Sequence, residues 1–170
     1  MNGQKLGLDF GKVIMGATKN GRADTSFLGT TFAEAMKSLP EEGAIESTRQ
    51  LVELFSGDVW IISKCGPSVE NKTKGWLKHW NFYEKTGLSR AKVRFCRKRH
   101  HKAGICRQLG ITHFVDDRLD VLIPMDGIVS NRYLFGEQRK GTEIPAWATA
   151  VGNWRQLLEQ FPGSHSVLGP

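Results

Sequence analysis

Residues 109–118 read Leu-Gly-Ile-Thr-His-Phe-Val-Asp-Asp-Arg, and this stretch decides the fold. Ile111–Val115 predicts a short buried strand that runs directly into the acidic pair Asp116 and Asp117. Gly110 is typical of the residue that closes a helix, which we expect over His101–Leu109. The stretch therefore predicts a helix, a glycine cap and a buried strand that ends on two carboxylates.

The same alternation of helix and strand extends on both sides of this stretch. Further strands are expected at 5–10 with 13–14, Asp58–Ser63, Val93–Cys96 and Ile128–Phe135. Further helices are expected at Phe32–Leu39, Ala44–Phe55, Pro67–Trp80 and Trp147–Phe161. Alternating elements imply right-handed crossovers. The predicted class is therefore α/β, with a Rossmann-like parallel sheet flanked by helices on both faces.

Length and composition indicate one globular domain. The chain has 170 residues, and we expect a domain over residues 1–162 and a loose tail over 163–170. No segment approaches the roughly 20 apolar residues of a membrane span. The start of the chain lacks a signal-peptide pattern, so a cytoplasmic protein without a membrane partner is expected. The net charge of +7 favours anionic partners such as phosphoesters, and nucleic acid on charge alone, with no motif behind it.

Much of the positive charge lies in residues 92–102. This run is either a solvated surface segment or an electropositive rim beside an anionic substrate. Cys96, His100, His101 and Cys106 lie close together in the same region and suggest zinc. Their spacing matches no usual paired-ligand pattern, which favours buried cysteines beside a solvated basic segment.

Five polar residues stand at or near predicted strand ends, where ligands bind in parallel sheets. Asp9 could attack phosphorus or bind a hard cation, and Asp116 with Asp117 could complete an oxygen-rich Mg²⁺ site. Ser63 could donate a hydrogen bond to a phosphoryl oxygen, and Lys102 could supply a positive charge. Singly, Asp9 could be a turn former and the acidic pair a helix cap. Together, the five residues favour phosphoryl transfer.

These residues resemble the four ordered motifs of the haloacid-dehalogenase-like (HAD) hydrolases, with a minimal cap. The motifs here are Leu6–Gly11, Trp60–Ser63, Lys102 and Thr112–Asp117. The resemblance covers about residues 5–135. It implies a Mg²⁺-dependent phosphohydrolase or phosphotransferase that acts through a phosphorylated aspartate.

The resemblance also implies the role of each residue. Asp9 would be the nucleophile and a metal ligand, and Lys102 would pair with it. The remaining metal ligands would be the Gly11 carbonyl, Asp117 and Asp116. The substrate, a phosphorylated small molecule or nucleotide, would contact Ser63, Lys64 and Lys12.

Gly11 departs from the family pattern, which usually has a second Asp at this position as general acid and base. Glycine cannot act as a general acid or base, and general acid–base catalysis is worth about 10²–10⁴ in rate. An alternative function is therefore a catalytically weak or silent protein that binds a phosphorylated ligand or a protein partner. Residues 15–31 are rich in glycine and small polar residues, which suits a flap with Lys19 and Arg22 as substrate contacts.

Overall fold

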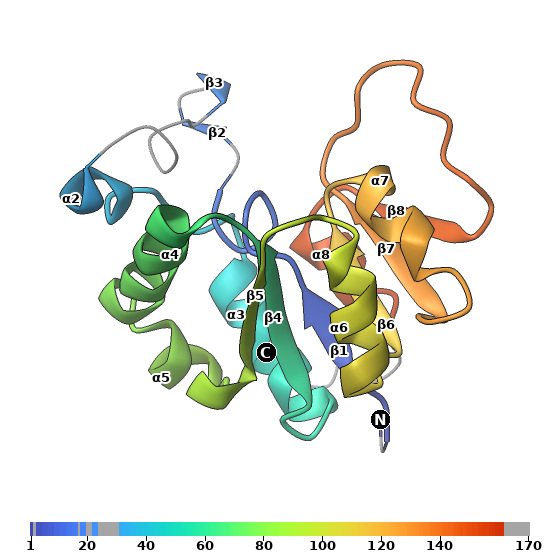
Figure 1. The fold of residues 1–170 in the computed structure, drawn as a ribbon, viewed down its shortest axis with the longest axis horizontal. Coiled ribbons are helices and arrows are strands. Elements are labelled where there is room, and N and C mark those ends of the chain that lie inside the picture. The colour runs from blue at the N-terminus through green and yellow to red at the C-terminus, as the bar shows by residue number, and fades with distance from the viewer. Residues whose placement is uncertain (2, 17, 20–21, 24–30, 162–170) are drawn as a thin grey trace, which may run out of the picture.

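The computed structural model describes residues 1, 3–16, 18–19, 22–23 and 31–161, with the backbone alone at 18–19 and 22–23. A six-stranded parallel sheet in the order β5-β4-β1-β6-β7-β8 forms its centre (Figure 1). The strands are β1 (Leu6–Leu8), β4 (Val59–Lys64), β5 (Val93–Cys96), β6 (His113–Asp116), β7 (Asn131–Phe135) and β8 (Ala148–Val151). The predicted α/β, Rossmann-like class is confirmed.

Helices cover both faces of the sheet and bury two hydrophobic clusters. They are α3 (Ala44–Leu54), α4 (Pro67–His79), α5 (Phe82–Thr86), α6 (His101–Leu109), α7 (Leu119–Leu122) and α8 (Trp154–Leu158). One cluster joins Leu6 and Leu8 of β1 to α3, α4, α5 and α8. The other joins Phe114 of β6 to Ala103 and Cys106 of α6. Figure 1 shows α3, α4 and α5 on one side of β4 and β5, and α6 on the other.

Alternation along the strands explains this division, because successive side chains point to opposite faces. Leu6 and Leu8 face the first cluster, and Gly7 between them faces Phe114 in the second. Four aromatic residues of this region pack in the first cluster: Trp76 of α4 and Phe82 of α5 are fully buried, and Trp80, which follows α4, and Tyr83 of α5 are partly buried.

In the connection from β1 to α3, the helix is shorter than predicted. The connection contains an antiparallel pair, β2 (Thr18–Lys19) and β3 (Arg22–Ala23), and the short helix α2 (Phe32–Ala35). The helix predicted at Phe32–Leu39 is wrong beyond Ala35. The chain turns at residues 36–37 and then pairs with the loop after β1, where the Gly16 N–H donates to the Leu39 carbonyl at 2.9 Å and Met15 bridges to Pro40.

The helix predicted at Trp147–Phe161 is also wrong in its first half, which forms β8. Parallel pairing with β7 holds Ala148–Val151 extended. The helix begins only at Trp154, where the Asn153 side chain accepts a hydrogen bond from the Gln156 N–H at 3.0 Å. None of the helices in the described part of the chain has the length and hydrophobicity that crossing a bilayer requires.

Candidate active site

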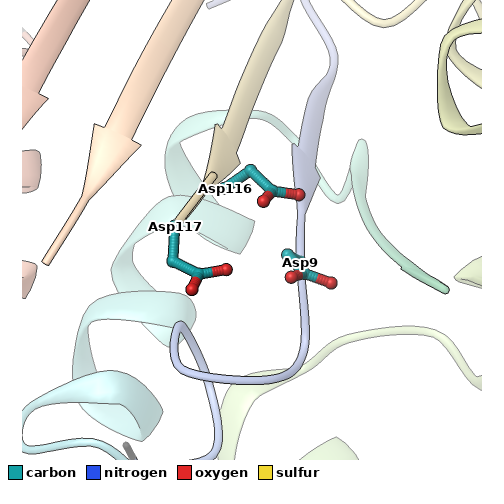
Figure 2. Close-up of side chains that lie close together, drawn as sticks. All are labelled: Asp9, Asp116 and Asp117. Carbon is teal, nitrogen blue, oxygen red and sulfur yellow. The ribbon is translucent and has the colours of Figure 1, made fainter. Parts of the chain in front are cut away.

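The candidate site lies at the carboxyl ends of β1 and β6, the two central neighbours in the sheet. Asp9 follows the last residue of β1, Asp116 ends β6, and Asp117 comes next. The chain changes face between these strands, since β1 leads to α3 on one face and α6 on the other leads into β6. Such a switch point leaves a crevice at the strand ends. Figure 2 shows the three carboxylates gathered there.

Lys102 is the hub of the site. Its Nζ lies 2.8 Å from Asp9 Oδ1 and 2.7 Å from Asp116 Oδ2. Lys102 and Asp116 are almost fully buried, and Asp9 keeps a small exposed surface. The second oxygen of Asp116 accepts the backbone N–H of Arg118 at 3.1 Å. Both oxygens of Asp116 are therefore fixed, whereas Lys102 engages only one oxygen of Asp9.

The Phe114 ring lies next to Lys102, and Gly7 leaves the space that this ring fills. The Lys102 Nζ lies 5.7 Å from the centre of the Phe114 ring, a cation–π distance. The Phe114 ring in turn fills the space beside Gly7, where an added Cβ would lie only 2.4 Å from a ring carbon. The absence of a side chain at Gly7 is therefore what lets Phe114 lie beneath Lys102.

At the strand ends, the three carboxylates lie around a single buried ammonium group, although further cations line the rest of the pocket. Burial raises the pKa of Asp116 well above its ordinary value, and the charge of Asp9 raises it further, while Lys102 opposes both. Burial and Asp9 likewise raise the pKa of Asp117. Burial alone would lower the pKa of Lys102, but the two bonded carboxylates raise it overall. Two carboxylates thus bond one buried ammonium group, with Asp117 beside them and 3.7 Å from the exposed Lys12, a balance that a bound cation would improve.

The arrangement fits a hard divalent cation. One oxygen from each of Asp9, Asp116 and Asp117 lies within 4.8 Å of the others, and this is the one such group of potential ligands among the described residues. Carboxylate oxygens are the ligands that Mg²⁺ prefers. The three aspartates predicted as metal ligands from the sequence are therefore brought together.

Gly11 lines the same pocket, in a tight turn after β1. The Lys12 N–H donates to the Met15 carbonyl at 2.8 Å, and the Met15 N–H donates to the Phe10 carbonyl at 3.0 Å. Among the backbone hydrogen bonds of the described residues, none uses the Gly11 carbonyl, so within that part of the chain it is available as a ligand. A Cβ built on Gly11 meets no atom within 4 Å. The turn thus has room for a side chain that the sequence does not supply.

The three residues predicted to contact substrate all line this pocket, which has a volume of about 270 Å³. Ser63 is buried near the end of β4, and within the described chain its hydroxyl makes no hydrogen bond. Lys64 is exposed at the rim. Lys12, also largely exposed, has its Nζ 3.7 Å from Asp117 Oδ2.

The basic segment divides between the pocket and the surface beside it. Arg99 lines the pocket, in agreement with the rim hypothesis. Arg97 is instead held by Glu70 at 2.8 Å and by the Cys65 carbonyl at 2.7 Å. Cys96 and Cys106 are buried free cysteines next to exposed basic residues, as the favoured interpretation predicted. The side chains of Lys19 and Arg22 lie outside the described residues.

Sequence reasoning missed part of the pocket wall. Val69 and Thr73 of α4 line it, as do Arg118 and Val121 after the acidic pair. The i, i+4 spacing of Val69 and Thr73 places both on one face of the helix that follows the Ser63 strand. That spacing was the signal available in the sequence.

Comparison with known proteins adds no assignment. No protein-family model matches the sequence, and no curated protein is significantly similar to it.

Proposed function

We propose that the chain is a Mg²⁺-dependent, HAD-like phosphohydrolase or phosphotransferase that acts on a phosphomonoester through a phosphorylated Asp9. The observation that carries the proposal is the buried Lys102, which bonds Asp9 and Asp116 at once beside Asp117. Lone strand-end aspartates occur for many reasons. A buried ammonium group shared by two carboxylates, with a third within reach, supports phosphoryl transfer, which needs positioned groups and charge neutralisation.

Asp9 would act as the nucleophile. Lys102 occupies its Oδ1, which orients the carboxylate and leaves Oδ2 to attack phosphorus. The new Oδ2–P bond replaces the bond from phosphorus to the leaving oxygen, which takes a proton from solvent. Water then attacks the same phosphorus, breaks the Oδ2–P bond and releases inorganic phosphate. Transfer to an acceptor hydroxyl in place of water would make the chain a phosphotransferase.

The other lining residues would bind the phosphoryl group. The Ser63 hydroxyl is free to donate to a phosphoryl oxygen, and Lys12 and Lys64 add positive charge at the rim. Asp9, Asp116, Asp117 and the Gly11 carbonyl would hold Mg²⁺. The ion would neutralise the negative charge that otherwise repels a phosphate from three aspartates.

Because Gly11 supplies no general acid or base, we expect the enzyme to be weak. Without an acid at this position, substrates with a poor leaving group should react slowly, and phospho-Asp9 should lose its phosphate slowly. The same residue supports a second candidate function, a protein that binds a phosphorylated ligand and turns it over little or not at all.

The first test asks whether Asp9 accepts a phosphoryl analogue. Beryllium fluoride with Mg²⁺ should raise the thermal unfolding midpoint of the wild type and leave Asp9→Asn unchanged, because the analogue binds the aspartate oxygen. The exposed Asp126→Asn is a matched control that should respond like the wild type. Equal shifts in wild type and Asp9→Asn, or no shift in either, would contradict a working nucleophile.

The second test separates the two candidate functions. Gly11→Asp should raise hydrolysis of a phosphomonoester about 10²–10⁴-fold, since an added side chain meets open space and supplies the missing acid. Gly11→Asn matches it in size and carries no transferable proton. A rise in Gly11→Asp alone supports a weak enzyme, whereas activity in neither variant favours the ligand-binding alternative.

A further inference from the structure

A second concave surface lies beside the candidate active site, between α4, α5 and β5. This groove has a volume of about 600 Å³, and Figure 1 shows α4 and α5, two of the elements that line it, to the left of β5. We call it the basic groove, and it is lined by Glu70, Lys74, Lys78, Tyr83, Arg90, Val93, Arg94, Phe95 and Arg97. Five of these nine residues are cationic and one is acidic.

The acidic residues present neutralise only part of this charge. Glu70 is shared by Lys74 at 2.7 Å and Arg97 at 2.8 Å. Arg90 pairs with Glu84 of α5. Each of these ion pairs is substantially exposed, so the pairs are weak and can rearrange around another anion.

Two cations of the basic groove have no acidic partner among the residues that the structure describes. The side chain of Lys78, in the last turn of α4, makes no hydrogen bond or ion pair with the described residues. Arg94 of β5 donates to the carbonyls of Ala91 and Val93, at 2.7 and 3.0 Å, and its guanidinium lies 4.8 Å from the centre of the Trp60 ring. A surface with such an excess of positive charge suits a ligand with several negative charges along its length.

Aromatic rings alternate with these cations. The Arg90 guanidinium lies 4.5 Å from the centre of the Tyr83 ring, and the Lys74 ammonium lies 5.4 Å from that of Phe95. Partly exposed rings and stacked guanidinium planes are the surfaces on which unpaired bases stack. An acidic peptide would use only the charges, and a membrane would require a flat or protruding apolar surface rather than a groove. Charge and rings together favour a nucleic-acid strand.

The basic groove and the active site share their walls. α4 contributes Val69 and Thr73 to the active-site pocket and Lys74 to the groove. At the end of β4, the Cys65 carbonyl that binds Arg97 lies two residues after Ser63 of the pocket. A strand in the groove would therefore end near Asp9.

We infer that the basic groove binds single-stranded nucleic acid and that the substrate is a strand with a terminal phosphate. The second half of this inference rests on the proposed phosphatase function, and strand binding does not. A strand along α4 and β5 places its sugar–phosphate backbone on Lys78 and Arg94. Its terminal phosphate then enters the pocket at Asp9.

Binding is tested with a fluorescent single-stranded oligonucleotide of about 12 nucleotides, followed by anisotropy at several salt concentrations. Lys78→Gln/Arg94→Gln should weaken binding about tenfold and lower the slope of log K against log salt by about 1–2. Lys140→Gln/Arg107→Gln removes the same charge from exposed positions outside the groove and should bind like the wild type. Equal weakening in both pairs, or tighter binding to anionic vesicles or to a polyglutamate peptide, would overturn the inference.

Phosphate release then separates this inference from the proposed function. The groove variant should lose about tenfold in kcat/KM for the end-phosphorylated oligonucleotide and keep wild-type activity on a small phosphomonoester. Unchanged activity on both substrates overturns the substrate class and leaves the proposed function standing. Strand binding that depends on the groove without phosphate release from either substrate supports the groove and counts against the proposed function.

Discussion

The strand β6 begins and ends on a buried titratable side chain, and the two ends have opposite surroundings. His113, at the start, packs against the rings of Phe55 and Phe161, with centroid distances of 5.4 and 5.7 Å. Asp116, three residues later, bonds Lys102 among other carboxylates. Burial works against charge at both ends, since it lowers the pKa of His113 and raises that of Asp116. The first end is stabilised by aromatic packing and by a hydrogen bond of 2.8 Å between Thr112 Oγ1 and His113 Nδ1, and among the described residues it involves no carboxylate. The stability of the second end depends on which cation is present.

The largest expected effect is at the charged end. Lys102→Met should destabilise the protein by about 3–5 kcal/mol, because it leaves buried carboxylates without their partner. Millimolar Mg²⁺ should restore part of the loss by binding those carboxylates. Urea unfolding with and without Mg²⁺ measures both effects. Lys98→Met, on the exposed part of the same basic segment, should change stability by no more than about 0.5 kcal/mol. A loss that Mg²⁺ leaves unchanged would break the comparison.

The matching substitution at the apolar end is Phe55→Ala. Phe55 is almost fully buried and contacts both His113 and Phe161, so its removal should cost about 3 kcal/mol. This loss should be the same with and without Mg²⁺, because no carboxylate of the site contacts the cavity. The same urea series measures it, and a Mg²⁺-dependent loss would show that the two ends are coupled.

A third prediction concerns the glycine beneath the charged end. Gly7→Ala should cost about 2 kcal/mol, since the new Cβ would overlap the Phe114 ring and displace it. Displacement of the Phe114 ring should also reduce the rise in thermal unfolding midpoint that beryllium fluoride and Mg²⁺ cause, because Phe114 lies under Lys102. Gly104→Ala in α6 is the control, where a Cβ meets open space and should stabilise by about 0.5–1 kcal/mol. Wild-type stability in Gly7→Ala would contradict this account of the packing.

The charged end was predictable from the sequence because its signal is local. An apolar run that ends on Asp116 and Asp117 identifies a strand end in a parallel sheet, where ligand sites form. Choosing Lys102 over its basic neighbours depended on the family resemblance. The helix itself carried a signal, since Lys102, Ala103 and Cys106 share the buried face of α6.

Other features could not be read from the sequence, for physical reasons. The apolar spacing of Val151, Trp154 and Leu157 fits a helical period, although Val151 ends a strand and the helix begins only at Trp154. Strand and helix here bury their side chains in one cluster, so the period continues across the boundary. The basic groove depends on tertiary packing that brings cations of α4 beside those of β5, and no spacing along the chain encodes it.

The smallest expected effect is a pH dependence at the apolar end. Burial lowers the pKa of His113 to about 4 from its ordinary 6.5, so between these values the unfolded chain binds the proton more tightly than the folded one. The contribution of His113 is complete above pH 6.5 and falls by about 1–2 kcal/mol on going from pH 7 to pH 5. Asp116 acts in the opposite direction, because its raised pKa favours the folded state as pH falls. The urea unfolding midpoint is therefore measured at pH 7 and at pH 5, and its fall between them should be larger in the wild type than in His113→Gln. The exposed His101→Gln is the control and should behave like the wild type. If His113→Gln loses as much stability between pH 7 and pH 5 as the wild type does, another group titrates. The contrast between the two ends of β6 is then removed.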